Sequence, residues 1–347
     1  MPPQVTDVAE RHRFDNAKLD AYLKREIEDF GSGMTVRQFQ GGASNPTFLL
    51  TTQRPGKEAH YVLRKKPPGQ LLASAHQVDR EYRVMKALGQ TDVPVPVMRH
   101  LCEDDAIIGT TFYVMDYLEG RIFRDATLPD LSPADRREIY DQLNLTLTKL
   151  HKVDHEAIGL GDFGKPGGYF ERQMGRWIKQ YRGAETEHIP EMEQLIDELS
   201  QSLPKDERVG ITHGDYRPEN TMFHPTEPRL IAVLDWELCT IGNPIADIAY
   251  NAYLWHSKGV GWGSLAGVDF KTSGIPTEEE YVAKYCERMG LARIDNFNWY
   301  VAFSVFRLAS IGQGVYKRII SGQGSMDRPA VNGAADIARD ALEILHR

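Results

Sequence analysis

The segment His213–Asp235 reads HGDYRPENTMFHPTEPRLIAVLD and alternates polar loop residues with short apolar runs. The fold of the chain is predicted mainly from this segment. The apolar residues 209–212 lead into it as a short strand. Residues 221–223 and 230–234 have the length and the apolar character of two further strands. Pro218 prevents a helix or a strand ladder from continuing through the segment, because proline lacks a backbone N–H. The segment is therefore predicted to place polar side chains on loops beside short buried strands.

Two acids and an amide occupy these loops in a fixed order. Asp215 and Asn220 lie on the first loop and Asp235 ends the last strand, so we expect the three side chains to converge on one point. Their oxygens suit Mg²⁺, which completes its shell with phosphate and water. In kinase-type phosphoryl transfer the same order supplies a base for the substrate hydroxyl and then two metal ligands. The order favours Asp215 as the general base, Arg217 beside the phosphoryl group and the other two residues as metal ligands; a surface hairpin with polar turn residues is the alternative.

Extended to residue 250, the segment resembles a known family. The pattern HGDYRPEN…LDWELCTIGNPIADIAY is similar to that of the aminoglycoside phosphotransferase and choline kinase family, and most of all to the kinase-like domain associated with acyl-CoA dehydrogenases. The resemblance runs from about residue 41 to about residue 256. It implies an α+β, bilobal, protein-kinase-like fold with an N-terminal antiparallel sheet lobe, carrying one or two helices, and a larger, mainly helical C-terminal lobe. We expect the lobes at residues 1–119 and 120–347, with a hinge near 115–119.

Two further residues have supporting roles in this resemblance. It implies that His213 holds the loop and that Asp247 accepts hydrogen bonds from the loop backbone. An acid that merely favours the first turn of a helix is the alternative for Asp247. Only 12 residues separate Asp235 from Asp247, which leaves no room for a long activation loop. A small acceptor is therefore favoured over a protein.

A glycine-containing turn, QGGASN at residues 40–45, separates two predicted strands at 36–39 and 47–51. Such a turn lets backbone N–H groups approach a phosphate, although an ordinary hairpin has the same composition. The resemblance assigns this turn to the nucleotide. The implied contacts are Gly41, Gly42, Ser44 and Asn45.

A basic strand end at residues 64–66 offers the cation that the family uses to hold the phosphates. The resemblance places Arg64 in that position, with Lys65 as the alternative; arginine adds bidentate geometry. A helix predicted over residues 76–88 carries Glu81, which the resemblance pairs with the strand cation, as in kinases. A Glu on the helix surface without such a role is the alternative.

A helix is predicted over residues 16–30, with Leu19 and Leu23 on its apolar face. Strands are predicted at residues 99–102, 106–108 and 111–117, and the last of them leads into the hinge. The resemblance implies that backbone groups around Met115 and Tyr117 bind the adenine. We expect ATP, and GTP stays open because backbone contacts leave little trace in the sequence.

The second half of the chain has helical periodicity. A Ser132-Pro133 pair begins one helix, and residues 277–280 form a capping box that begins another. The spacing of an aromatic stripe on the helix predicted over 298–320 favours the core over a pocket, although the resemblance implies that the C-terminal helices line the acceptor site. The predicted helices cover residues 132–150, 169–181, 190–203, 298–320 and 331–345, besides the one that begins at 277.

Composition excludes several classes of function. The net charge of −8 argues against nucleic acid or anionic membrane as a partner. Cys102, Cys239 and Cys286 lack the spacing of a disulfide framework or a zinc site, which indicates a reducing cytoplasm. There is no apolar run of about 18 residues for a membrane span, and no apolar signal segment follows Met1.

The function favoured by these residues is ATP- and Mg²⁺-dependent O-phosphotransfer to a hydroxyl of a small molecule. The resemblance implies a hydroxyacyl-CoA-like acceptor and a functional association with an acyl-CoA dehydrogenase. An aminoglycoside-type antibiotic kinase is weighed lower, because a polycation needs an acidic pocket and the C-terminal third has mixed charge. The alternative from another class is a non-catalytic nucleotide-binding module that regulates an acyl-CoA-metabolising partner. The loss of a catalytic group would favour that module, and each expected group is present.

Overall fold

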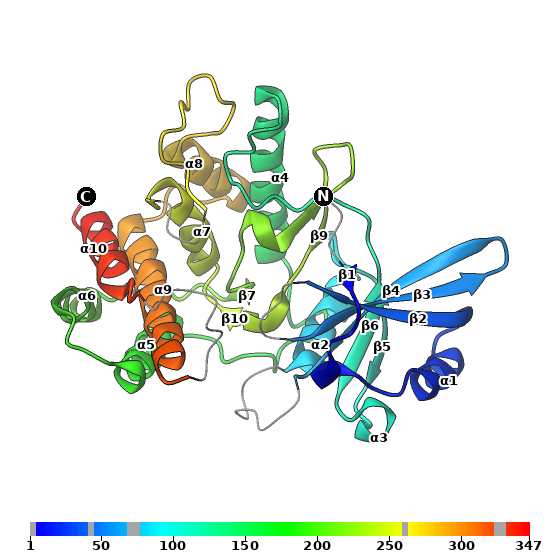
Figure 1. Cartoon of the computed structure of the whole chain (residues 1–347). Helices are drawn as coiled ribbons and strands as arrows, with labels where there is room; N and C mark the ends of the chain where they lie inside the picture. Colours follow the sequence, from blue (N-terminus) through cyan, green and yellow to red (C-terminus); the bar gives the residue numbers. More distant parts are fainter. Residues whose placement is uncertain (1–4, 41–44, 68–76, 259–262, 323–330) are drawn as a thin grey trace. The chain divides into compact units, whose positions relative to one another are not determined.

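The protein is described by a computed structural model that covers residues 5–40, 45–67, 77–258, 263–322 and 331–347 (Figure 1). The chain divides into two compact units. Unit 1 contains Met1–Ile122, Ile158–Leu160 and Asn220–Cys239, and unit 2 contains Phe123–Ala157, Gly161–Glu219 and Thr240–Arg347. The sequence predicted a single boundary near residue 119. In the structure, residues 220–239 group with the N-terminal sheet, although they follow most of the second predicted lobe in sequence.

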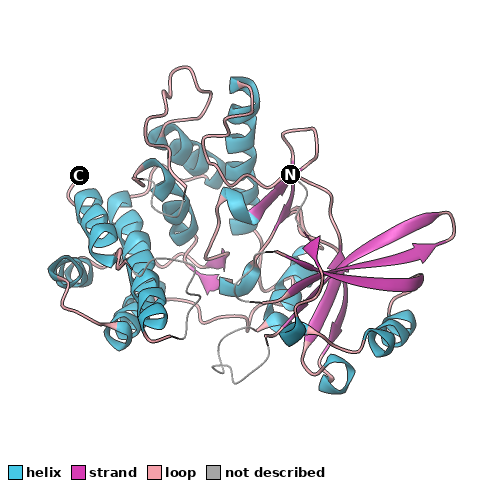
Figure 2. Ribbon diagram, in the orientation of Figure 1, coloured by secondary structure: helices cyan, strands magenta, loops and turns pink. Residues whose placement is uncertain are grey.

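Unit 1 is built on a sheet whose neighbouring strands are all antiparallel (Figure 2). The strand order is β1-β2-β3-β4-β6-β5. β3 and β4 form a long hairpin in which Thr47 pairs with Arg64 at one end and Arg54 pairs with Lys57 at the other. The strands are β1 (Val5–Thr6), β2 (Ser32–Phe39), β3 (Thr47–Arg54), β4 (Lys57–Lys65), β5 (Met98–Cys102) and β6 (Phe112–Asp116).

Helix α1 (Asn16–Glu26) covers one part of this sheet, as its periodicity predicts. Leu19 and Leu23 on its apolar face are fully buried, and they belong to a core that includes Phe48 and Leu50 of β3. Helix α2 (Val78–Leu88) buries its own apolar face and carries Glu81. The unit also contains the short 3-10 helix η1 (Glu10–His12).

The strand predicted at residues 106–108 is wrong, because these residues form the helical turn α3 (Asp105–Ile108). The Asp104 side chain accepts a hydrogen bond from the backbone N–H of Ala106 at 2.9 Å, which caps the turn. Gly109 ends it with a φ of 85°. A polar N-cap and a left-handed glycine five positions apart outweigh the apolar run between them.

A second, smaller hairpin in unit 1 consists of β8 (Thr221–Phe223) and β9 (Leu230–Val233). The 3-10 helix η2 (Pro218–Asn220) precedes it and η3 (Trp236–Leu238) follows it. The backbone N–H of Leu234 donates to the carbonyl of Asn220 at 2.8 Å. The hairpin therefore brings the chain segments of the two predicted metal ligands, Asn220 and Asp235, side by side.

Unit 2 is mainly helical and contains one two-stranded sheet, β7 (Gly210–Thr212) with β10 (Thr240–Gly242). Ser132 caps α4, and Thr277 forms the predicted capping box at α8. The helices are α4 (Pro133–His151), α5 (Tyr169–Ala184), α6 (Pro190–Gln201), α7 (Ile245–Ala252), η4 (Tyr253–Trp255), α8 (Glu278–Met289), α9 (Phe297–Ile320) and α10 (Ala334–Leu345).

The aromatic stripe of α9 is part of the core of unit 2, as predicted. Trp299 and Phe303 are at most 3% exposed. Phe170 of α5 packs edge-on against both rings, with centroids 5.4 and 5.6 Å away. Helix α10 lies alongside α9 (Figure 1).

The three cysteines are buried free thiols. Among the described residues, no helix combines the length and the apolar character that crossing a bilayer requires.

Two glycines in the loop before α8 generate a test of packing in unit 2. A Cβ at Gly274 (φ 83°) would lie 1.9 Å from the carbonyl oxygen of Pro133, whereas a Cβ at Gly267 (φ 79°) would meet no atom within 4 Å. We expect Gly267→Ala to lower the free energy of unfolding by about 1 kcal/mol, the cost of a left-handed residue. Gly274→Ala should cost about 3 kcal/mol, because it adds a backbone clash. Urea denaturation of both variants measures the difference, and equal losses would contradict the packing.

Candidate active site

Arg64 lies near the end of β4 and faces three carboxylates of unit 1. Its Nη2 lies 2.8 Å from Oδ1 of Asp235, and its Nε lies 3.1 Å from Oε2 of Glu81. Oε2 of Glu237 lies 3.7 Å from Nη2. A planar guanidinium can serve several carboxylates at once, because its donors form a rigid fork. The structure therefore contains the predicted pairing of the strand cation with Glu81 and adds Asp235 to it.

Glu81 is not a surface residue, so that alternative is wrong. Its side chain is 1% exposed, and it accepts hydrogen bonds from Nδ2 of Asn45 at 2.8 Å and from the hydroxyl of Tyr113 at 3.1 Å. Burial raises the pKa of Glu81 to about 7, and the nearby charge of Arg64 opposes this rise. A buried acid held by three partners can fix the direction of the Arg64 side chain.

Lys65 occupies the other face of β4, because successive side chains of a strand point to opposite faces. Its Nζ lies 5.8 Å from the ring centroid of Phe14 and 5.9 Å from that of Phe48. Burial lowers the pKa of Lys65. Of the two adjacent cations, only Arg64 faces Glu81 and Asp235, and this geometry favours Arg64 as the phosphate ligand.

Asn220 and Asp235 flank the β8–β9 hairpin and form a donor set that fits Mg²⁺. An amide oxygen and a carboxylate oxygen are ligands that this ion accepts. The Asp235 side chain is 35% exposed and open to a ligand. Its backbone has a φ of 62°, a left-handed conformation that is uncommon for residues other than glycine. Such conformations concentrate at functional sites, where the surroundings enforce them.

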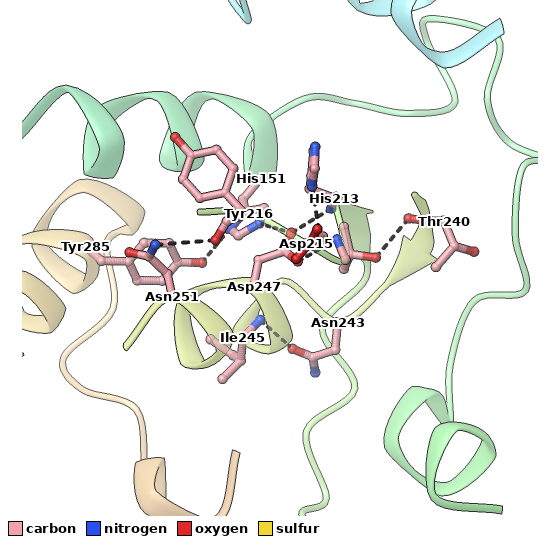
Figure 3. Close-up of polar contacts among 12 residues, drawn as sticks. His151, His213, Asp215, Tyr216, Thr240, Asn243, Ile245, Asp247, Asn251 and Tyr285 are labelled. Carbon is pink, nitrogen blue, oxygen red and sulfur yellow. Dashed lines mark hydrogen bonds and ion pairs between the residues drawn. The ribbon is translucent and has the colours of Figure 1, made fainter. Parts of the chain in front are cut away.

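Asp247 organises the loop that carries Asp215 in unit 2 (Figure 3). The backbone N–H groups of His213 and Gly214 donate to its carboxylate at 2.6 and 2.8 Å. Nε2 of His151 lies 3.2 Å from the same carboxylate. Burial raises the pKa of Asp247, but the hydrogen bonds from His151 and Gly214 outweigh it and lower the pKa below its ordinary value. A favourable helix dipole alone does not explain a fully buried acid with these partners.

His213 holds the loop through its side chain as well. Its Nδ1 accepts a hydrogen bond from the backbone N–H of Asp215 at 3.2 Å. Asn243 fixes the start of α7, because its Oδ1 accepts from the N–H of Ile245 at 2.9 Å. The helix that carries Asp247 and the loop that it binds are thus each capped locally and then joined by the buried carboxylate (Figure 3).

The side chain of Asp215 has polar neighbours within unit 2. The hydroxyl of Tyr250 donates to its Oδ1. Nε of Arg217 lies 3.5 Å from the same oxygen, and Nη1 of Arg217 lies 2.6 Å from Oε2 of Glu219. Arg217 is thus held between two carboxylates.

The sequence analysis did not assign a function to Tyr250, Arg307 or Glu237. Tyr250 follows Asp247 by three residues, and this spacing puts both on one face of α7. That spacing was the only available signal. Arg307 lies in an apolar helix far along the chain, and only the tertiary structure brings it to residue 214.

Part of the predicted nucleotide site lies outside the described residues, namely Gly41, Gly42 and Ser44. Asn45 is described and is 1% exposed, and its amide nitrogen donates to Glu81. This contact gives Asn45 a role in orienting Glu81. A contact of Asn45 with phosphate stays a prediction.

The predicted hinge residues lie at the end of β6. Met115 pairs with Val62 of β4 and Met98 of β5 in the ladder. The backbone N–H of Tyr117 donates to the carbonyl of His60 at 3.3 Å. Adenine binding by Met115 and Tyr117 stays a prediction.

Comparisons with known proteins agree with this geometry. Residues 35–269 match the sequence profile of the phosphotransferase enzyme family (APH). The chain is 46% identical over 326 residues to acyl-CoA dehydrogenase family member 10 of Mus musculus. The aligned part covers 93% of this chain and 30% of that protein. The chain thus spans less than a third of the length of this curated relative.

Solved structures have the same fold. The chain is 45% identical to a Ralstonia eutropha JMP134 protein assigned to the aminoglycoside phosphotransferases, with a TM-score of 0.87 over 96% of this chain and 99% of that one. Choline kinase from Cryptosporidium parvum Iowa II has a TM-score of 0.61 at 13% identity over 95% of both chains. The predicted fold class, an N-terminal antiparallel sheet followed by a mainly helical part, is confirmed.

Adjacent residues of β4 provide a matched test of the ion pair. Arg64→Met removes the cation that compensates buried Glu81, so we expect the free energy of unfolding to fall by about 3 kcal/mol near pH 7. Lys65→Met removes a buried amine among aromatic rings and should change it by less than about 1 kcal/mol. Urea denaturation measures both.

The pH dependence gives a second check on the same variant. Because the folded pKa of Glu81 lies above its unfolded value, the group stabilises the fold at low pH and this contribution is lost as the pH rises through about 7. Without Arg64 the pKa of Glu81 in the folded protein rises further. The difference in the free energy of unfolding between wild type and Arg64→Met should therefore increase between about pH 6 and about pH 9. A difference that stays constant with pH would contradict the pairing.

Asp247→Asn tests the loop anchor, because an amide cannot accept from three donors as a carboxylate does. We expect a loss of about 3 kcal/mol at pH 7, against less than about 0.5 kcal/mol for Asp130→Asn at an exposed position. The pKa of Asp247 is lowered in the folded protein. Its contribution to the free energy of unfolding is therefore present above about pH 3.9 and is lost as the pH falls through the pKa of the folded state. The difference in the free energy of unfolding between wild type and Asp247→Asn should thus become smaller in acid. A difference that persists in acid would argue against an ionised Asp247.

Proposed function

The chain belongs to the phosphotransferase enzyme family, and from this premise we propose that it transfers the γ-phosphoryl group of magnesium-bound ATP to a hydroxyl group of a small molecule. The observation that carries the proposal is the ion pairing of Arg64 with buried Glu81 and with Asp235. Phosphoryl transfer in kinases requires a strand cation paired with a helix acid, and a metal-binding Asp. We assign these three roles to Arg64, Glu81 and Asp235 of unit 1.

Unit 1 contributes the groups that bind the nucleotide. Arg64 donates to the phosphates, and Glu81 keeps its guanidinium in the required direction. Asn220 and Asp235 hold Mg²⁺. When bound, the ion neutralises charge on the phosphate oxygens. Arg64 and Asp235 compensate each other's charge at 2.8 Å. In the proposed reaction Arg64 exchanges this contact for phosphate and Asp235 exchanges it for the metal.

Unit 2 contributes the general base. In the proposed step the acceptor oxygen forms a bond to the γ-phosphorus, the bond from that phosphorus to the bridging oxygen of ADP breaks, and the hydroxyl proton passes to Asp215. A positioned base contributes roughly 10²- to 10⁴-fold to the rate. Asp247 and His213 keep the loop in the conformation that presents Asp215, and Arg217 is the cation proposed for the transferred phosphoryl group.

For the acceptor we propose an acyl-CoA-like molecule that carries a hydroxyl group. The support is the similarity to acyl-CoA dehydrogenase family member 10, in which a segment like this chain belongs to a protein named for acyl-CoA oxidation. A functional association with an acyl-CoA dehydrogenase and a cytoplasmic location follow as parts of this proposal. An aminoglycoside acceptor, GTP as donor and a non-catalytic regulatory role are outcomes that the experiment distinguishes.

The experiment combines nucleotide binding with a turnover screen. Calorimetry with ATP and with GTP, each with and without Mg²⁺, identifies the donor. Consumption of that nucleotide is then followed over hydroxyacyl-CoAs and amino sugars. Binding without turnover on any acceptor would support the regulatory module instead.

Two substitutions separate the proposed roles. Asp215→Ala should reduce transfer by at least about 10²-fold and leave nucleotide affinity nearly unchanged, because it removes only the base. Asp235→Ala should weaken Mg²⁺-dependent nucleotide binding by about tenfold or more, because it removes a charged metal ligand. Equal loss of binding and transfer in Asp215→Ala would contradict the base assignment. Unchanged binding in Asp235→Ala would remove that residue from the metal site.

A further inference from the structure

The catalytic loop of unit 2 receives contacts from two helices that the proposed mechanism does not use. Tyr250 of α7 donates its hydroxyl to Oδ1 of Asp215. Arg307 of α9 donates from Nη2 to the carbonyl of Gly214. The guanidinium carbon of Arg307 lies 4.7 Å from the ring centroid of Tyr250. Two consecutive loop residues are therefore held by two side chains that also contact each other.

We propose that Tyr250 and Arg307 are positioning residues that fix the carboxylate of Asp215 in the conformation from which it accepts the acceptor's proton. The inference rests on the proposed function, because Asp215 is the base only there. Tyr250 acts on the side chain of Asp215, and Arg307 acts through the backbone of Gly214 and through the ring of Tyr250.

The burial of Arg307 indicates that its contacts matter. Arg307 is 8% exposed. Among the residues that the structure describes, its contacts are the carbonyl of Gly214 and the ring of Tyr250, and no carboxylate forms an ion pair with it. A buried cation is costly unless it is well compensated. An apolar residue would fill the same space without this cost, so the charge of Arg307 points to a role beyond packing.

The chemistry of the pair suits a base. A guanidinium over a phenol ring is attracted by the ring electrons. The withdrawal of electron density strengthens the phenol as a donor, and a donor to the charged form of a carboxylate favours that form. Burial, followed by the charge of Asp215, raises the pKa of Tyr250 well above its ordinary value, so its hydroxyl stays protonated.

Within unit 2, the groups around Asp215 come from its own loop and from α7: the loop supplies Arg217 and the His213 ring, and α7 supplies Tyr250. Arg307 of α9 contacts the neighbouring carbonyl of Gly214 and the ring of Tyr250. Arg217 also pairs with Glu219 at 2.6 Å and is thus shared with a second carboxylate. Tyr250 is a neutral donor to Asp215, because its raised pKa keeps the hydroxyl protonated.

The test is Tyr250→Phe, which keeps the ring and removes the donor, with Tyr140→Phe as matched control. Tyr140 is also buried in unit 2, and its hydroxyl donates to the carbonyl of Ala126 at 2.7 Å rather than to the loop. The direct readout is the pKa of the Asp215 carboxyl, measured by carbon-detected NMR on the intact chain. We expect it to rise in Tyr250→Phe, which loses a donor to the charged form, and to stay unchanged in Tyr140→Phe.

Two further measurements keep the proposal falsifiable. The acidic limb of the pH profile of nucleotide turnover should move in the same direction in Tyr250→Phe, with kcat lowered about tenfold and the nucleotide KM unchanged. If Tyr250→Phe does not fold, Arg307→Met should raise the Asp215 pKa, and Arg307→Lys should raise it less. An unchanged Asp215 pKa in a folded variant would overturn the proposal. A raised pKa in a chain without any turnover would support the positioning and refute the transferase function instead.

Discussion

A buried carboxylate must be compensated by a cation or by hydrogen-bond donors, and this constraint organises both units. In unit 1 the acid is Glu81, and Arg64 with two neutral donors compensates it. In unit 2 the acid is Asp247, and two backbone N–H groups and His151 compensate it. In each case the partners of the acid belong to the segment proposed to act in phosphoryl transfer, so the same contacts that keep the fold stable also hold the functional groups.

The two acids differ in their electrostatic balance. For Glu81 burial prevails and the pKa rises to about 7, whereas for Asp247 the hydrogen bonds prevail and the pKa falls. The difference follows from the partners: His151 contributes most to lowering the pKa of Asp247, and the backbone N–H of Gly214 adds to it. The hydrogen bonds from two consecutive backbone amides also tie the loop to this carboxylate. A rigid loop is what a general base needs, since catalysis in this chemistry depends mostly on positioning and preorganised charge.

Much of the fold followed from local pattern. Apolar periodicity predicted the α1 face with Leu19 and Leu23, and the Ser132 and Thr277 caps marked helix starts that the structure has. The error at residues 106–108 also has a local cause, because an Asp cap and a left-handed glycine outweighed three apolar residues. Periodicity alone cannot separate a short strand from a single helical turn, since both bury two or three apolar side chains.

The sequence by itself determined the order of the polar groups from Asp215 to Asp247, the family and the general fold, because these depend on spacing along the chain. It left open whether Arg64 or Lys65 contacts the phosphates, and it gave no role to Tyr250 or Arg307. Only the tertiary structure shows which of the two basic residues faces Glu81, and which groups Tyr250 and Arg307 contact. The alternation of side chains across β4 puts Arg64 with Glu81 and Lys65 among aromatic rings, and helix packing in unit 2 brings Arg307 to Gly214 across 93 positions of sequence. Contacts between residues so far apart depend on how strands pair and helices pack, which no short pattern records.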